Sequence, residues 1–345
     1  MGKIHVGLDL GSTTCHVGGI DDDGKEVVNR KFDTSEKNAI EESKSIRGEV
    51  HVHMEASELA GWMRQVLLPH VHRVVVSDPK QNSWIAKDPR KEDSVDAFKL
   101  AWLLRMGKFC EVYYDPNVDR AVFKQAVRHH DDMRDRQAKL KVKIKARYRM
   151  QGVIPRGQAV FGPRGRKTWL EQVPSADARI CIEQLYSLLD YTLKIEEEAF
   201  GHMVRLAKQY PEIGRFDRVP GVGPIGACRF SAYIQTPRRF SSKRKLWRYC
   251  GLAVSDRSSD GKPLGRPRLD RWSGCPPLKD LSYKAFLGTQ LTKNDNLFKR
   301  TFAQALKTPK NRTHARLTTQ RKIVAVLWAM WRDETEFQDD LGKVR

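Results

Sequence analysis

The chain has no long hydrophobic run and no closely spaced cysteines, and both absences narrow the kind of protein it can be. Its 345 residues contain no run of eighteen or more apolar residues, and no apolar segment follows a basic start. We therefore predict neither a membrane span nor a signal peptide. The closest two of the six cysteines, Cys228 and Cys250, are 22 residues apart. This spacing fits neither a disulfide framework nor a zinc knuckle, so we expect buried free thiols in an intracellular protein.

Basic residues are abundant and unevenly distributed. The formal net charge is +21, yet residues 1–115 hold 16 Lys and Arg against 19 Asp and Glu, and the other 230 residues hold 47 against 23. A mildly acidic N-terminal part joined to a basic body is typical of a metal-dependent catalytic domain fused to a scaffold that binds a polyanion. A generic basic protein is the alternative. No basic amphipathic helix stands beside an apolar anchor, which argues against a membrane surface as the partner.

Strands and helices alternate in the N-terminal third of the chain. Apolar residues recur at a period of two in the first and fourth strands, form a short continuous run in the fifth, and recur at helical spacing in the helix that lies between these two strands. The first strand ends at Asp9 and the fourth at Glu55. This order of elements, with acids at two strand ends, predicts a ribonuclease H-like domain. The expected strands cover residues 3–9, 15–20, 25–32, 49–55 and 73–76, and the expected helices cover 35–46, 58–68 and 91–104.

Four acids of this region form a candidate metal site. Asp93 and Asp96 are three residues apart, so they share one helical face. Taken singly, they are ordinary helix-start residues and Asp9 is an ordinary turn aspartate. Together with Glu55, however, four converging carboxylates would repel one another unless a cation lay between them, and one or two Mg²⁺ ions fit oxygen ligands. Two such ions about 4 Å apart can activate an attacking oxygen and stabilise a leaving one at a phosphodiester.

Two long helices are predicted in the middle of the chain. Residues 117–150 contain eleven Lys and Arg against four acids. Residues 140–148 also alternate like a strand, but the flanking helix formers favour a helix. We expect an exposed loop over 151–168 and a second helix over 176–209. Such a pair predicts a coiled-coil arm for self-association, and a hairpin packed inside one chain is the alternative.

A glycine-rich stretch begins the C-terminal part. Residues 219–227 contain G-x-G-x-x-G, but no strand precedes it and no acid is placed to hold a ribose, which argues against a dinucleotide site. A tight turn between two helices fits better. Its backbone N–H groups around Gly221 and Gly223 would bind a backbone phosphate, or it is a plain helix–helix turn.

Basic and aromatic residues are interleaved just downstream. Charge suits phosphates and rings suit base stacking, so this stretch is a candidate nucleic-acid surface. A basic helix with its rings in the core is the alternative. A polar loop is expected over 251–266, and helices over 276–290 and 314–337. The basic residues are Arg238, Arg239, Lys243, Arg244, Lys245 and Arg248, and the rings are Phe240, Trp247 and Tyr249.

The order and spacing of these motifs resemble the IS110 family of insertion-sequence transposases, the bridge-RNA-guided recombinases that also include Piv-type DNA invertases. The resemblance covers nearly the whole chain. It implies a fold of α/β plus α, with a RuvC-like domain over 1–115, a helical coiled-coil arm over 116–212 and a mostly helical C-terminal transposase domain over 213–345. The motifs that carry it are Gly7-Leu8-Asp9, Met54-Glu55-Ala56, the stretch from Lys91 to Ala97, Pro220 to Pro224, Phe240 to Leu252, and Ser258 to Lys262.

The resemblance also implies a chemistry. Asp9, Glu55, Asp93 and Asp96 would hold Mg²⁺, and Ser259 would attack DNA to give a covalent phosphoserine. Because Ser258 precedes Ser259, the nucleophile could be either. The segment Pro267 to Pro277 differs from the Gly- and Lys-rich run that the family has there.

The implied partners are donor and target DNA, a non-coding bridge RNA that specifies both by base pairing, and further copies of the chain, as a dimer that assembles to a tetramer. The implied location is the cytoplasm of a prokaryote, at the nucleoid. Two other functions remain open. One is a RuvC-like, Holliday-junction-type nuclease whose acids activate water without serine chemistry. The other is a nucleic-acid-binding scaffold without activity.

Overall fold

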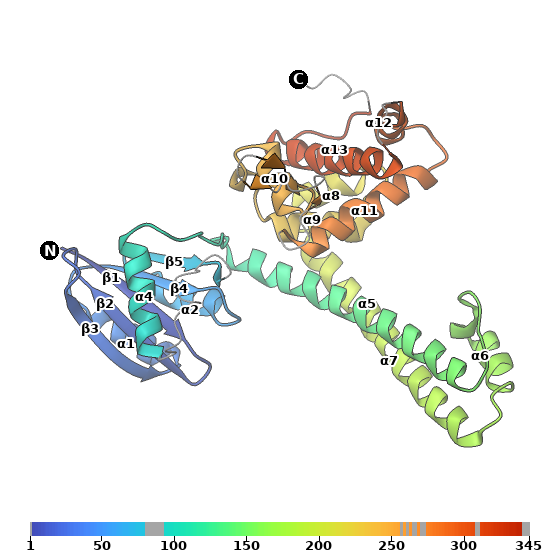
Figure 1. Cartoon of the computed structure of the whole chain (residues 1–345), viewed down its shortest axis with the longest axis horizontal. Coiled ribbons are helices and arrows are strands. Elements are labelled where there is room, and N and C mark those ends of the chain that lie inside the picture. Colours follow the sequence, from blue (N-terminus) through green and yellow to red (C-terminus); the bar gives the residue numbers. More distant parts are fainter. Residues whose placement is uncertain are drawn as a thin grey trace. The chain divides into compact units, whose positions relative to one another are not determined.

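The computed structural model describes residues 2–79, 93–255, 258–259, 262–263, 268–269, 274–307 and 311–339 (Figure 1). The chain divides into two compact units, Met1–Tyr114 and Asp115–Arg345. None of the helices in these described ranges is long and apolar enough to cross a membrane. The six cysteines are free thiols. Cys15, Cys228 and Cys250 are buried as expected, whereas Cys110 and Cys181 are exposed.

A five-stranded sheet in the order β3-β2-β1-β4-β5 forms the first unit. The β1 strand is antiparallel to β2 and parallel to β4, and β4 is parallel to β5. The sequence predicted all five strands, from alternating apolar residues in β1 and β4, from the Asp-Gly turn between β2 and β3, and from a short apolar run in β5. Their bounds are β1 Lys3–Leu10, β2 Thr14–Ile20, β3 Glu26–Asp33, β4 Glu49–Glu55 and β5 Arg73–Ser77.

Helices cover both faces of this sheet (Figure 1). On one face, α1 (Glu36–Ser45) and α2 (Ala60–Leu67) pack on a core that includes Val6 and Leu8. On the other face, α4 (Asp93–Arg105) crosses β1 and β2. The predicted fold class, a ribonuclease H-like α/β domain followed by a mostly helical remainder, is confirmed.

The second unit begins with an antiparallel helical hairpin made of α5 (Val118–Met150) and α7 (Ala176–Ala207). Residues 140–148 are therefore helical and not a strand. The two helices pack on each other within one chain, and self-association stays a prediction. The prediction of a loop over 151–168 was wrong in part, because α6 (Pro163–Leu170) forms there with proline at its first position, where a helix needs no N–H donor.

The two ends of the hairpin belong to separate hydrophobic cores. At its base, Phe123 and Val127 of α5 join the large core of the C-terminal helices. At its tip, Ile144 and Tyr148 of α5 pack on residues of α7 that include Ile182. The tip therefore has a small core of its own.

The remaining helices form a bundle around α13 (Arg312–Arg332), which buries Ile323, Val324 and Leu327 completely. The short α12 was not predicted, although Phe298, Phe302 and Leu306 recur at the four-residue spacing of a helix. The other bundle elements are α8 Pro211–Asp217, α9 Gly223–Ile234, the 3₁₀ turn η3 Pro237–Arg239, α10 Lys243–Tyr249, α11 Pro276–Leu291 and α12 Leu297–Leu306.

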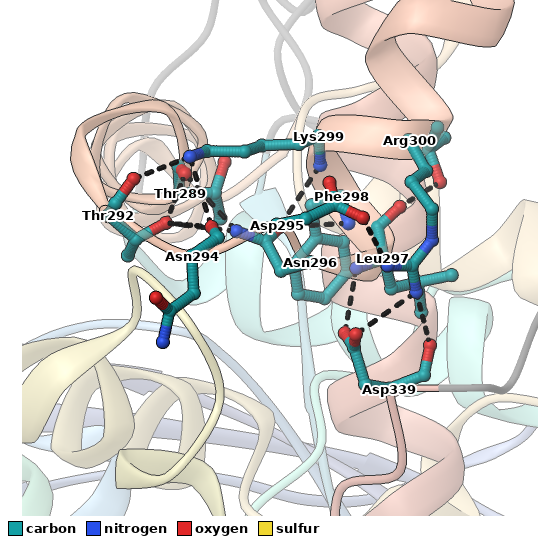
Figure 2. Close-up of polar contacts among 11 residues, drawn as sticks. Thr289, Thr292, Asn294, Asp295, Asn296, Leu297, Phe298, Lys299, Arg300 and Asp339 are labelled. Atoms are coloured by element: carbon teal, nitrogen blue, oxygen red, sulfur yellow. Dashed lines mark hydrogen bonds and ion pairs between the residues drawn. The ribbon is translucent and has the colours of Figure 1, made fainter.

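A polar network fixes the corner between α11 and α12 (Figure 2). Asn296 caps α12 by accepting from the N–H groups of its first turn, and its side-chain amide donates to the Thr289 carbonyl at 3.3 Å. Asp339 accepts from Leu297 N at 2.7 Å and pairs with Arg300 at 3.1 Å. Caps and ion pairs of this kind give hydrogen-bond partners to backbone groups at the helix ends, which have no partner within the helix. The last turns of α11 are therefore held firmly in place.

Candidate active site

Asp9 and Glu55 lie side by side at the carboxyl ends of two neighbouring parallel strands. The register pairs Leu8 with Met54, so the next residues on the two strands are these two acids. Neighbouring strands lie about 4.8 Å apart. Gly7 and His53, two residues earlier, both face α4. Since side chains alternate along a strand, Asp9 and Glu55 point to the same side of the sheet, toward α4.

The α4 helix approaches β1 closely because Gly7 places no side chain beneath it. A Cβ atom on Gly7 would fall against the Ala97 carbonyl and 2.7 Å from Ala101 N. At the other end of α4, Arg105 donates to the Asp22 carbonyl in the β2–β3 turn, beside the start of β1. The helix therefore runs antiparallel to β1. Its first turn lies toward the strand ends where Asp9 and Glu55 stand.

Both predicted helix acids are on this N-terminal part of α4. The helix begins at Asp93, although the side chain of Asp93 lies outside the described residues. Asp96 is partly exposed, and its Oδ1 lies 3.2 Å from Lys99 Nζ. The structure thus brings together the elements that carry the four predicted acids, with a lysine one turn along from Asp96.

The chemistry of this group fits a hard divalent cation. Carboxylate oxygens are the donors that Mg²⁺ prefers, and no soft sulfur donor was predicted among them. Among the described side chains, which exclude that of Asp93, no three acids, histidines or cysteines form a group that could hold an ion. Lys99 beside Asp96 shows that this edge already accommodates positive charge next to a carboxylate.

A buried histidine joins the sheet to α4, and the sequence did not reveal it. His53 is fully buried; its Nδ1 lies 2.8 Å from the Leu100 carbonyl of α4, and its Nε2 lies 2.8 Å from Ser77 Oγ on β5. A carbonyl can only accept, so Nδ1 donates and Nε2 accepts from the Ser77 hydroxyl. Burial lowers the pKa of His53, which keeps the ring neutral. An alternating histidine in a strand carries no signal that separates this role from a surface position.

The predicted serines lie in a short β-hairpin and not in an irregular loop. Ser258 pairs with Pro263 and Ser259 with Lys262, in strands β7 (Ser258–Ser259) and β8 (Lys262–Pro263). A second pair, β6 (Val254–Ser255) and β9 (Arg268–Leu269), flanks it. The side chains of both serines are outside the described residues. The rest of the 256–273 stretch, including residues 267 and 270–273 of the segment that departs from the family pattern, is outside them as well.

The glycine-rich turn connects α8 to α9, and its two predicted glycines differ. Gly221 has φ +82°, and a Cβ there would lie 2.6 Å from Thr289 N of α11. This glycine is therefore required by packing against the corner of Figure 2. Gly223, with φ +63°, begins α9 with nothing within 4 Å of its Cβ position. Only Gly223 leaves open space for an approaching group.

Two family models match the chain. Residues 6–150 match a model for DEDD transposases of the IS110 family, described as Transposase, and residues 214–302 match one described as Transposase IS116/IS110/IS902 family. The chain carries IS110-family transposase domains. The matches include the strand-end acids in one case and the glycine turn and serine hairpin in the other. They support a DNA-acting transposase of an insertion sequence, with divalent metal use suggested by the DEDD domain. No curated protein matches the chain.

In the basic stretch around α10, the exposed charged side chains are cations, and the aromatic side chains are not exposed. Three of its six basic residues begin α10, a fourth, Arg248, lies in the last turn of the helix, and Arg238 precedes them; all five are exposed. Arg239 instead turns inward, stacking 4.5 Å from the Tyr249 ring and donating to the Tyr233 carbonyl at 3.2 Å. The exposed residues are Arg238, Lys243, Arg244, Lys245 and Arg248.

The aromatic side chains of the same stretch face the core of the transposase. Phe240 is buried, and the Trp247 indole donates to the Arg321 carbonyl at 3.1 Å. Stacking of bases needs an open ring face. The rings therefore lie where the alternative interpretation predicted them, in the core behind a basic helix. Phosphate binding by the exposed cations stays a prediction.

Proposed function

We propose that this transposase cuts and rejoins donor and target DNA through a covalent phosphoserine, with divalent metal held by Asp9, Glu55, Asp93 and Asp96 and with Ser259 as the nucleophile. The observation that supports the proposal is the meeting of β1, β4 and the first turn of α4, since these three segments carry the predicted acids and come together at the carboxyl ends of the two strands. Bound Mg²⁺ would supply stabilisation of the charge that develops on the phosphate oxygens.

The covalent step would conserve the energy of the DNA backbone. The Ser259 oxygen forms a bond to phosphorus while the bond from phosphorus to the sugar oxygen breaks. The serine hydroxyl loses its proton, and the departing sugar oxygen gains one. The reverse reaction with another strand end then rejoins DNA and frees the serine. In the β7–β8 hairpin, Lys262 is the register partner of Ser259.

The proposed partners follow from charge and from the family. The last 230 residues carry an excess of 24 positive charges, which suits two DNA duplexes and a guide RNA held at once. The family resemblance implies the bridge RNA, and it also implies that the chain forms a dimer that assembles to a tetramer. RNA that co-purifies with the protein should be a single discrete species. Sequencing this RNA and supplying its matching DNA ends in a recombination assay tests whether it specifies the DNA sites. If the RNA consists of random fragments, the protein does not use a bridge RNA.

Trapping of the covalent adduct tests the serine. Ser259→Ala should abolish the protein–DNA adduct, while Ser258→Ala, its matched neighbour, should retain it. If the adduct is lost only in Ser258→Ala, the nucleophile is Ser258. Unchanged cleavage in both variants, without an adduct in the native protein, favours the RuvC-like nuclease in which acids activate water.

Substitution of an acid tests the metal site. Asp9→Asn should stop strand cleavage while DNA binding is retained, because this carboxylate contributes to catalysis and not to binding of the DNA phosphates. Glu49→Gln is the matched control, since Glu49 lies at the opposite end of β4 and is partly exposed. Full recombination by Asp9→Asn would exclude a role for this acid. Absence of cleavage even in the native protein, under any divalent metal, would favour the inactive scaffold.

A further inference from the structure

The outer part of the hairpin is a stretch of chain without acids. From Arg136 to Leu170 the sequence has eleven Lys and Arg and no Asp or Glu. The two hairpin helices differ in charge, because α5 carries eleven basic and four acidic residues whereas α7 carries three basic and six acidic ones. The positive charge therefore belongs to one helix of the pair and is not a general property of the surface.

Four of these cations form a stripe on the exposed side of α5. Arg136, Lys139, Lys143 and Arg147 are spaced by three, four and four residues, so they lie on one face of the helix, and all are exposed. We call these four residues the basic stripe. At 1.5 Å per residue the stripe is about 16 Å long. This length matches about five successive phosphates of one duplex strand at 3.4 Å each.

The basic stripe has no carboxylate partners in the described part of the chain. The ion pairs of the hairpin involve other residues, such as Arg166 with Asp190 at 2.6 Å and His130 with Glu196 at 3.0 Å. Like charges three and four residues apart on a helix destabilise it. The stripe thus opposes the stability of α5, which indicates that its charges serve binding to something outside the chain.

The tip core holds the basic stripe in a fixed orientation. Ile144 and Tyr148, each next to a stripe residue, are fully buried against α7. The Tyr148 hydroxyl lies 3.1 Å from that of Tyr186, which in turn donates to the Val160 carbonyl at 2.8 Å. The α5 helix cannot rotate about its axis without exposing these residues. A rigid, pre-oriented row of cations loses little conformational entropy on binding.

We propose that the basic stripe binds the backbone phosphates of a nucleic-acid duplex without regard to sequence. The stripe begins at Arg136, nine residues or about 14 Å along α5 from Val127 at the hairpin base. It is therefore separate from the α10 surface and the serine hairpin. The chemistry recognised is a regular row of phosphodiester anions, which DNA and RNA duplexes both offer. The proposal goes beyond strand cleavage, so a protein that fails every test of the serine mechanism can still pass the following test.

The experiment measures the dissociation constant of the full-length protein for a DNA duplex and for an RNA duplex over a series of salt concentrations. The fourfold variant Arg136→Gln, Lys139→Gln, Lys143→Gln and Arg147→Gln should lower the slope of log affinity against log salt by about 3.6 for a DNA duplex, at about 0.9 for each lost phosphate contact. The double variant of the two lysines should lower it by about half as much. The duplex whose slope changes identifies the source of the phosphates.

A charge-matched control excludes a simple effect of net charge. The control variant replaces four exposed cations of the first unit by Gln and should leave both slopes unchanged. These cations are Lys25, Lys31, Lys44 and Arg47. Equal slopes for the native protein and the fourfold variant, on both duplexes, would overturn the proposal. A fourfold variant that loses its oligomeric state in sedimentation while both slopes stay unchanged would overturn it as well, in favour of a role in self-association.

Discussion

Replacing Gly7 by alanine should separate the two halves of the acidic site without touching any acid. The new Cβ would lie 2.7 Å from Ala101 N and 2.8 Å from Leu100 Cβ, whereas ordinary contacts between non-bonded heavy atoms are about 3.5 to 4.0 Å. The backbone of α4 must therefore move away by about 1 Å, and the first turn of the helix moves with it. Overpacking of this kind costs about 1–3 kcal/mol.

The effect on catalysis should exceed the effect on stability. A misplacement of about 1 Å at a reacting centre can cost about 100-fold in rate. We expect Gly7→Ala to lower the DNA cleavage rate about 100-fold, measured with all DNA bound, and to lower the melting temperature of the protein. Gly201→Ala is the control, because only the end of the Arg205 side chain lies within 4 Å of its Cβ position. If Gly7→Ala cleaves at the native rate, the close packing of α4 does not position the acids.

Two further predictions concern stability. Because burial lowers the pKa of His53 below the unfolded value of about 6.5, the unfolded chain binds the proton first as the pH falls. The free energy of unfolding should therefore drop by up to about 1.4 kcal/mol per pH unit below pH 6.5. Thermal unfolding of a His53→Gln variant should show a smaller drop between pH 7.5 and 5.5. Arg229 is buried, with its guanidinium 2.6 Å from Asp131, so Arg229→Met removes the arginine cation beside a largely buried carboxylate, whose other neighbour His130 is 3.7 Å away, and should cost about 3–5 kcal/mol. The control Arg218→Met removes an exposed pair with Glu336 and should cost less than about 1 kcal/mol, and equal melting temperatures for the two variants would refute the role of burial.

The sequence predicted the sheet well because its strands have clear local apolar patterns, which alternate in β1 and β4 and are continuous in β5. In β1 the apolar residues Ile4, Val6 and Leu8 face the core, and this single pattern located both the strand and the acid at its end. The long α5 was also predicted, although its second half alternates like a strand, because helix formers dominate the segment. Patterns of this kind depend on local periodicity alone.

Features that depend on contacts between distant segments could not be predicted. His53 is a structural link only because Leu100 and Ser77 are brought to it by the fold. Arg239 looked like its exposed neighbours in the sequence, yet it stacks on Tyr249, ten residues away. In the same way, Gly221 has a packing role that is set by α11, more than sixty residues later.

The separate cores at the two ends of the hairpin have a consequence for how the protein opens locally. Between Val127 and Ile144, the buried residues of α5 are Met133 and His130, whose ring hydrogen-bonds Glu196. Amide groups there are held by less apolar burial than those at either end, so their exchange with deuterated water should be faster. The hairpin should then show two slowly exchanging ends and a faster middle. Such a pattern means that the tip can remain folded while the helical middle transiently opens.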